Sequence, residues 1–456
     1  MNLLLNTDSY KASHFLQYPQ GTSVVSSYIE SHGGRFDGTV FFGLQAFIKQ
    51  YLLQPFSRAD IEEAAEVLTA HGLPFNREGW EYILETYNGY LPLEIEAVPE
   101  GTVLPVHNVM VQVRNTDSAC AWLTSYIETA LLRAVWYPTT VATYSRACKQ
   151  VIARYLAETA DSMEGLLFKL HDFGARGASS EETAALGGMA HLVNFLGSDN
   201  LSAVMAARRY YREPMAALSI PAAEHSTITS WGRDGEREAY ANMLAQFGGA
   251  GKVVAVVSDS YDLWNAIDTL WGEELKEAVL NSGGTLVIRP DSGDPVAVVS
   301  TTLEKLMVKF GYSVNGKGYK VLPGCVRVIQ GDGISLDSIE AILAEMKIRG
   351  LSAENIAFGM GGELLQKVNR DTQRFAMKAS AACVNDAWRE VWKDPVTDSG
   401  KRSKRGRLAL VRNTGGDYET VREEALAGRC NLLRTVYRNG ELRAEDSLAV
   451  IRERAI

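Results

Sequence analysis

Cysteine is scarce in this sequence of 456 residues, and none of its cysteines lies in a Cys-x-x-Cys pair. The five are Cys120, Cys148, Cys325, Cys383 and Cys430. An odd number of widely spaced cysteines is typical of reduced thiols in a cytoplasmic protein. This spacing also excludes a cysteine-based metal cluster.

Long hydrophobic runs and an excess of positive charge are missing as well. The apolar run "VVAVV" at 253–257 is far too short to span a bilayer, and the start, "MNLLLNTDSYKASH", is not expected to act as a signal peptide. The formal net charge of -9 argues against general nucleic-acid binding, although a local basic pocket can still bind a small anion. We therefore expect a soluble cytoplasmic protein with no membrane or nucleic-acid partner.

The sequence does contain a repeated strand–loop–helix pattern, which begins near residue 165. A short apolar run is followed by a Gly/Asp-rich loop and then by a helical pattern, seven times in succession. Continuous β-branched runs predict parallel strands covered on both faces, so residues 151–379 are expected to form a (β/α)₈-like barrel. A doubly wound sheet would give a similar rhythm. Residues 1–150 with 380–456 are expected to form a composite α+β domain.

The loops that follow the predicted strands are rich in polar residues. In parallel α/β folds, ligands bind beyond the carboxyl ends of the strands, so these loops should meet at one face. Arginines pair with phosphate oxygens, aspartates accept hydrogen bonds from ribose hydroxyls, and glycines let backbone N–H groups approach phosphate. The set predicts a phosphorylated sugar as ligand: 171–177 "HDFGARG", 197–199 "GSD", 224–226 "EHS", 258–260 "SDS", 289–293 "RPDSG", 331–333 "GDG" and 359–362 "GMGG".

His225 follows an apolar run that ends at Pro221, where a strand gives way to a helix. A histidine at this position can simply be capped by its neighbours at the helix start. A nucleophilic imidazole instead needs one free nitrogen and a carboxylate that holds the other. Asp259, at the end of the next strand, is the expected partner, and Glu224 is the rival.

Two further segments have several interpretations. Residues 393–407, "KDPVTDSGKRSKRGR", form a solvated loop, a basic localisation-like patch or a lysine-rich flap over pyrophosphate. Residues 6–19 are polar and aromatic and can be a plain surface segment.

A sugar-phosphate isomerase or aldolase barrel is the rival enzyme class, but the barrel loops offer no obvious Schiff-base lysine.

Several stretches together resemble the nicotinamide phosphoribosyltransferase family of type II phosphoribosyltransferases. The resemblance covers nearly the whole chain, in the family's order, through these motifs: "TDSYKASHFLQYP", "HDFGARG", "PAAEHSTITSWG", "VVSDSYD", "IRPDSGDP", "VIQGDG", "AFGMGGELLQK" and "KDPVTDSGKRSKRGR". It implies transfer of a phosphoribosyl group from 5-phosphoribosyl 1-pyrophosphate to nicotinamide, giving nicotinamide mononucleotide and pyrophosphate. Nicotinate as acceptor is the nearest alternative.

The resemblance also implies coupling to ATP hydrolysis through a phosphorylated histidine. By its motif this is His225, whose Nε2 is expected to attack the γ-phosphate while Asp259 holds the other ring nitrogen. Mg²⁺ is the implied cofactor and ATP a co-substrate. A homodimer with its active site at the subunit interface is the implied assembly.

Other roles carry over position by position. Phe173 and, from a second subunit, Tyr10 would hold the nicotinamide ring between them, and Asp199 would accept a hydrogen bond from the carboxamide. A carboxylate there repels nicotinate, which favours the amide. The remaining expected contacts are Arg176 and Arg289 (ring and phosphates), Asp291, Gly331 and Asp332 (ribose), Gly361, Gly362 and Arg370 (5′-phosphate), and Lys378, Lys393 and Lys401 (pyrophosphate or ATP).

The chain departs from the family pattern at three positions. His32 stands where arginine is frequent, Ala175 where an aromatic residue is common and Met360 where serine is frequent. These differences bear on ligand affinity rather than on the reaction.

Overall fold

The computed structural model describes residues 2–397 and 402–456 and divides the chain into two compact units. The first unit contains Met1–Thr143, Ala207–Glu213 and Asn369–Ile456. The second contains Tyr144–Ala206 and Pro214–Val368. Among the described residues, no helix combines the length and apolar character needed to cross a membrane.

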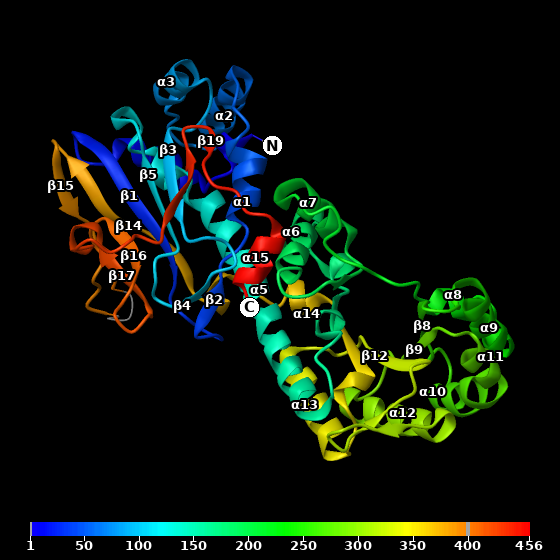
Figure 1. The fold of residues 1–456 in the computed structure, drawn as a ribbon. Helices are drawn as coiled ribbons and strands as arrows, with labels where there is room; N and C mark the ends of the chain where they lie inside the picture. Colours follow the sequence, from blue (N-terminus) through cyan, green and yellow to red (C-terminus); the bar gives the residue numbers. More distant parts are fainter. Residues whose placement is uncertain (1, 398–401) are drawn as a thin grey trace. The chain divides into compact units, whose positions relative to one another are not determined.

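A seven-stranded antiparallel sheet forms the centre of the first unit (Figure 1). Its order is β15 (Ala387–Glu390), β14 (Phe375–Val384), β1 (Thr22–Ser31), β5 (Val111–Asn115), β3 (Leu93–Ala97), β18 (Arg434–Arg438) and β19 (Glu441–Leu442). The blue strand β1 lies beside the orange strand β14, so the two ends of the chain share one sheet. Two small antiparallel pairs accompany it, β2 (Gly38–Val40) with β4 (Val103–Pro105) and β16 (Leu408–Arg412) with β17 (Tyr418–Arg422).

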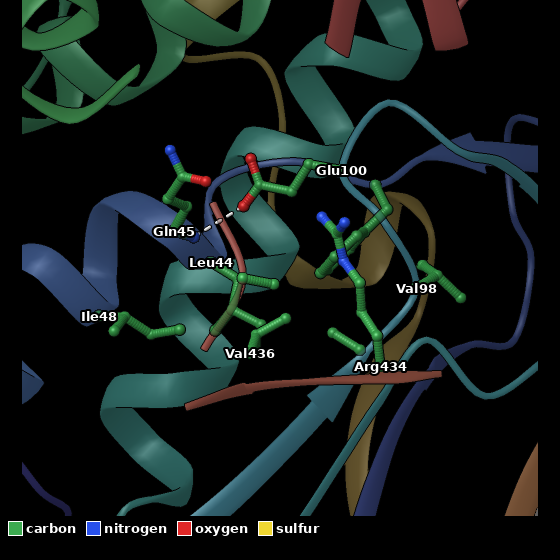
Figure 2. Close-up of a pocket in the computed structure, with 10 residues that line it drawn as sticks. Leu44, Gln45, Ile48, Val98, Glu100, Arg434 and Val436 are labelled. Carbon is green, nitrogen blue, oxygen red and sulfur yellow. Dashed lines mark hydrogen bonds between the residues drawn. The ribbon is translucent and has the colours of Figure 1, made fainter. Parts of the chain in front are cut away.

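Helices and a large apolar core complete the first unit. The helices are α1 (Leu44–Phe47), α2 (Arg58–Ala70), α3 (Arg77–Tyr87), α4 (Leu123–Tyr126), α15 (Leu448–Arg454) and the start of α5 (Glu128–Thr159), which continues into the second unit. The Glu100 carboxylate is buried here beside a cavity of about 20 Å³ and accepts a hydrogen bond from Gln45 N at 2.7 Å (Figure 2). It accepts a second hydrogen bond from Tyr211 Oη at 2.8 Å. Burial raises the pKa of Glu100 to about 7.

Six parallel strands form the second unit's sheet, in the order β7 (Gly197–Ser198), β6 (Leu170–Asp172), β13 (Ile356–Met360), β12 (Val326–Gln330), β9 (Thr285–Arg289) and β8 (Val253–Val257). An irregular segment closes the ring between the two edge strands. Leu218 bridges Gly197 of β7, and Ala222 bridges Ala255 of β8, both in parallel. All seven predicted βα units therefore contribute, six as strands and one as this segment.

Helices follow the strands of the second unit with ordinary capping chemistry. They are α6 (Glu181–His191), α7 (Leu201–Tyr211, which ends in the first unit), α8 (His225–Thr229), α9 (Glu236–Phe247), α10 (Leu263–Asn265), a π-helix (Ala266–Glu274), α11 (Lys276–Asn281), α12 (Pro295–Phe310), α13 (Leu336–Ile348) and α14 (Gly362–Leu365); β10 (Ser313–Val314) pairs with β11 (Lys320–Val321). Asp294 caps α12 through Ala297 N at 3.0 Å, and Pro295 follows at the first helical position.

Small residues leave the inside of this ring open. Ala222, Ala255 and Ala357 line a cavity of about 450 Å³, together with Val287 and Ile329. Barrel interiors are ordinarily filled by layers of bulky branched side chains. The ring of this chain instead encloses room for a small aromatic ligand.

Candidate active site

His225 and Asp259 form a direct pair at the carboxyl ends of the strands. His225 opens α8, and its Nε2 lies 3.1 Å from Asp259 Oδ1, which follows β8. The Asp259 side chain is only 5% exposed, whereas that of His225 is 45% exposed. The predicted partner is therefore in place, and the rival Glu224 instead accepts from Ser226 Oγ.

The nitrogen assignment made from the sequence is wrong in one respect. Asp259 contacts Nε2, so Nδ1 is the ring nitrogen left for chemistry, and it lies 3.9 Å from Asp291 Oδ2. Nε2 lies one bond farther from Cγ than Nδ1 does, so it is the ring nitrogen that reaches the loop after β8. When Nε2–H donates to Asp259, Nδ1 carries the lone pair.

The loop after β9 holds the Asp259 carboxylate. Its Oδ2 accepts from Asp291 N at 3.1 Å and from Ser292 Oγ at 2.5 Å, which leaves Oδ1 directed at the imidazole. Asp291 itself lies 3.5 Å from the Arg289 guanidinium. Burial raises the pKa of Asp291, the charge of Arg289 opposes this, and the charge of Asp259 adds to it.

Asp199 and Phe173 lie at the ends of β7 and β6 and line the cavity. Ser219 Oγ donates to Asp199 Oδ1 at 2.5 Å, so the exposed carboxylate is oriented. The Phe173 ring lies against the backbone of Gly359, where a Cβ would stand 2.0 Å from ring atom Cε2. Glycine at 359 thus admits the aromatic ring. A flat ring and a carboxylate at one cavity fit a small planar amide.

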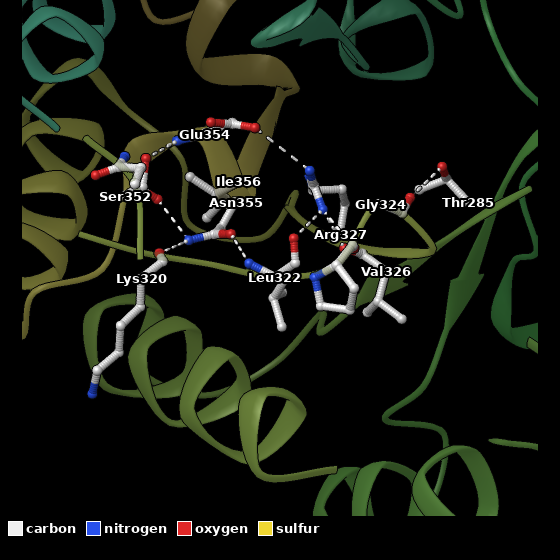
Figure 3. A network of polar contacts seen from close by, with 12 residues as sticks. Thr285, Lys320, Leu322, Gly324, Val326, Arg327, Ser352, Glu354, Asn355 and Ile356 are labelled. Atoms are coloured by element: carbon white, nitrogen blue, oxygen red, sulfur yellow. Dashed lines mark hydrogen bonds and ion pairs between the residues drawn. The ribbon is translucent and has the colours of Figure 1, made fainter. Parts of the chain in front are cut away.

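The cavity continues to the opposite end of the ring, where a polar network surrounds Asn355. Its side-chain oxygen accepts a hydrogen bond from Leu322 N, and its side-chain nitrogen donates to Lys320 O and Ser352 O (Figure 3). Nearby, the Arg327 guanidinium lies 3.6 Å from the Glu354 carboxylate. Lys169 Nζ donates to the carbonyls of Glu354 and Ile356 at 2.8 and 2.9 Å. Burial lowers the pKa of Lys169 to about 8.

The other predicted barrel residues lie in loops at the carboxyl ends of the strands, as the strand pattern predicts. Arg289, at the end of β9, lines the cavity, and its buried Nε has no hydrogen-bond partner among the described residues. Arg176 is exposed in a short turn after β6, and Asp332 is exposed after β12, with Gly331 against Phe173. A Cβ added to Gly362 would meet open space, and one added to Gly361 would lie 3.8 Å from Phe173 O. The helix α14, which begins here, has only four residues and adds little dipole.

Four predicted ligands belong to the first unit. Tyr10 is 57% exposed, and Arg370 and Lys393 are exposed. Lys378 Nζ, on β14, lies 2.9 Å from His32 Nε2, just after the end of β1, and burial lowers the pKa of both groups. Lys401 lies outside the described residues.

The described part of the chain holds no group of three or more His, Cys, Asp or Glu side chains arranged to bind a metal ion, and therefore no preformed Mg²⁺ site of that kind. Mg²⁺ that arrives on substrate phosphates requires only one or two protein carboxylates. Asp291 and Asp332, in the loops after β9 and β12, are the carboxylates that would hold such an ion.

Comparison with known proteins adds to this geometry. Residues 168–441 match the nicotinate phosphoribosyltransferase (NAPRTase) family, and residues 2–95 match the nicotinamide phosphoribosyltransferase N-terminal domain. A relative from Xanthomonas campestris named nicotinamide phosphoribosyltransferase is 56% identical over 460 residues, which cover 100% of this chain and 98% of the relative. The chain belongs to the nicotinamide phosphoribosyltransferases, within the nicotinate phosphoribosyltransferase family.

Two further matches support the phosphoribosyltransferase assignment and the fold. A nicotinamide phosphoribosyltransferase from Acinetobacter baylyi is 33% identical over 491 residues, covering 100% of this chain and 97% of the relative. The crystal structure of nicotinate-nucleotide pyrophosphorylase from Pyrococcus furiosus superposes with a TM-score of 0.63 at 17% identity, covering 100% of this chain and 95% of that one. The predicted enzyme class and the predicted α/β fold are confirmed.

Some residues of this phosphoribosyltransferase site escaped the sequence reasoning. Ser219 and Ser292 orient the two carboxylates, and Asn200 bonds the buried Asp172. Ser292 lies within the "RPDSGD" motif, so its position after a strand end was available as a signal. The contact between Asn200 and Asp172 had no signal in the sequence, because the two residues are 28 positions apart.

Proposed function

We propose that this phosphoribosyltransferase joins nicotinamide to 5-phosphoribosyl 1-pyrophosphate, forming nicotinamide mononucleotide and pyrophosphate, with ATP hydrolysis coupled through His225. The observation that carries the proposal is the convergence of Asp199, His225 and Arg289 at one end of a single ring of strands. The names of the two relatives support nicotinamide rather than nicotinate as the acceptor.

The ATP step uses the free imidazole nitrogen. With Nε2–H donated to Asp259, the Nδ1 lone pair of His225 attacks the γ-phosphorus of ATP, and the bond to the bridging oxygen of ADP breaks. ADP leaves and a phosphohistidine remains, which water later hydrolyses to phosphate. Asp259 stabilises the positive charge that develops on the ring during attack.

The acceptor is held by shape and by one hydrogen bond. Nicotinamide lies against the Phe173 ring and donates its carboxamide N–H to Asp199, which Ser219 keeps oriented. The exposed ring of Tyr10 closes the other face from a second subunit in a homodimer. Nicotinate would place its carboxylate against Asp199, and this like-charge contact disfavours it.

Formation of the C–N bond then depends on stabilising the leaving group. Pyrophosphate departs from C1 of the ribose, positive charge develops on the sugar, and the pyridine nitrogen forms the new bond. Arg289, Arg370 and the lysines Lys378, Lys393 and Lys401 are the proposed phosphate and pyrophosphate ligands, which offset the negative charge that gathers on the departing pyrophosphate. Mg²⁺ bound to the phosphates would add to this charge stabilisation. Positioning of the flat ring supplies much of the acceleration.

The test is direct. Purified protein is incubated with nicotinamide, 5-phosphoribosyl 1-pyrophosphate, Mg²⁺ and ATP, and the mononucleotide is measured by mass spectrometry. The His225→Ala variant should lose ATP hydrolysis and phosphohistidine while keeping slow ATP-independent turnover. ATP hydrolysis that persists in His225→Ala contradicts the assigned nucleophile, and absence of mononucleotide from the unaltered protein contradicts the reaction.

A further inference from the structure

A buried polar pair joins the strands that carry the two nicotinamide contacts. Asn200 Nδ2 donates to Asp172 Oδ2 at 2.9 Å, and the two side chains are almost completely inaccessible, with residue exposures of 1% and 0%. Asp172 ends β6, and Asn200 follows β7 at the start of α7. The proposed mechanism uses neither residue.

Every hydrogen-bonding group of the Asn200 side chain is engaged. Its second Nδ2 hydrogen is donated to Ala184 O on α6 at 2.8 Å, and its Oδ1 accepts from Ala203 N at the start of α7 at 3.2 Å. An amide has two donors on nitrogen, so this side chain ties one strand end to two helices at once. Buried polar networks of this kind fix a single arrangement when all their members are satisfied.

The Asp172 side of the pair is equally constrained. Its Oδ1 accepts from Gly174 N at 2.7 Å, and its backbone carbonyl accepts from Asp199 N at 3.1 Å. Helix α6 approaches so closely that a Cβ on Gly188 would lie 2.5 Å from Asn200 Nδ2 and 2.9 Å from Asp172 Oδ2. The pair has no space in which to shift.

The geometry points to a role in the reaction. Phe173 directly follows Asp172, and Asp199 directly precedes Asn200. We propose that Asp172 and Asn200 are positioning residues, which set the offset between the Phe173 ring and the Asp199 carboxylate and thereby the preference for nicotinamide over nicotinate. This inference rests on the proposed function, because it concerns the same acceptor site.

One variant separates this role from helix capping. Asn200→Ser keeps a side-chain oxygen to cap α7 but removes both amide donors. We expect the KM for nicotinamide to rise by about 10- to 100-fold, with a smaller change in kcat, because a displacement near 1 Å is enough to cost that much. The ratio of kcat/KM for nicotinamide to that for nicotinate should fall by about tenfold or more. ATP hydrolysis without acceptor should stay unchanged, since His225 lies on another strand end.

Two controls distinguish positioning from general stability. Thr159→Ala removes another buried brace of the same unit, in which Thr159 Oγ1 accepts from Ala353 N at 2.9 Å ahead of the amino end of β13. It should lower the melting temperature without changing the selectivity ratio. The double variant Asp172→Asn/Asn200→Asp restores a donor–acceptor pair between these two positions. It should recover part of the selectivity for nicotinamide over nicotinate that the single variant Asn200→Asp loses.

The outcomes are distinct. Unchanged selectivity and KM in a folded Asn200→Ser protein overturn the positioning role while leaving the reaction intact. A parallel loss of acceptor-free ATP hydrolysis also overturns it, because the pair then only supports the fold. Unaltered protein that forms no mononucleotide overturns the proposed function and this inference with it.

Discussion

Asp259 Oδ1 lies 3.1 Å from His225 Nε2, and this contact determines which ring nitrogen is free. Asp259→Asn tests it, because an amide nitrogen at this position would donate to Nε2 and shift the ring proton to Nδ1. We expect ATP hydrolysis to fall by about 100-fold or more, because the wrong tautomer leaves no lone pair on Nδ1 for attack. Single-turnover formation of acid-labile phosphohistidine measures the step. Unimpaired phosphohistidine formation would show that the tautomer does not matter.

Ser292 supports the same carboxylate from behind. Ser292→Ala removes the 2.5 Å hydrogen bond to Asp259 Oδ2 but leaves the one from Asp291 N. ATP hydrolysis should fall by about tenfold, the equivalent of roughly 1.4 kcal/mol for one charge-assisted hydrogen bond. Ser292→Thr keeps the hydroxyl and serves as the control. Equal losses in Ser292→Ala and Ser292→Thr would mean that loop packing, not the hydrogen bond, is responsible.

Asp199 carries the predicted discrimination between amide and acid. Asp199→Ser removes the charge that opposes nicotinate, so the preference for nicotinamide should weaken by tenfold or more, or about 1.4 kcal/mol at least. Competition between the two acceptors, followed by mass spectrometry of both mononucleotides, gives the ratio directly. Ser219→Ala leaves the charge in place and should raise the KM for nicotinamide more than it changes the ratio. If the ratio of the two mononucleotides is unaltered in Asp199→Ser, the charge of Asp199 is not what disfavours nicotinate.

The strand ends could be predicted because their signals are local: an apolar β-branched run precedes the polar loop, as at Asp259 and Asp291. A ring of strands was also expected, but that residues 218–222 close it as an irregular segment rather than as a strand could not be predicted, because the bridges of Leu218 and Ala222 depend on distant partners. The cavity was also invisible in the sequence, since it exists only because Ala255 and Ala357 face inward together.

Gly359 controls the place of the aromatic ring. In Gly359→Ala the new Cβ would stand 2.0 Å from Phe173 Cε2, so the ring must move. We expect the KM for nicotinamide to rise by about tenfold or more, since the stacking surface is displaced. Gly324→Ala is the matched control, because nothing lies within 4 Å of its added Cβ. If both variants bind nicotinamide equally well in calorimetry, Phe173 is not the ring that holds the acceptor.

Glu100 gives the first unit a pH-dependent stability. Its pKa is about 7 in the folded protein against an ordinary value of 4.5, so the folded state binds the proton more tightly than the unfolded state does. The associated stability is present below about pH 4.5 and is lost as the pH rises through 7, by on the order of 3 kcal/mol.

Glu100→Gln has no proton to lose, and its amide can still accept from Gln45 N. The free energy of unfolding of this variant, relative to that of the unaltered protein, should therefore increase between about pH 4.5 and about pH 8 in urea titrations. Glu424→Gln, at a carboxylate whose side chain is 71% exposed, should show no such change. A relative stability of Glu100→Gln that stays constant with pH would mean that Glu100 is already ionised in the folded protein, held so by the hydrogen bonds from Gln45 and Tyr211.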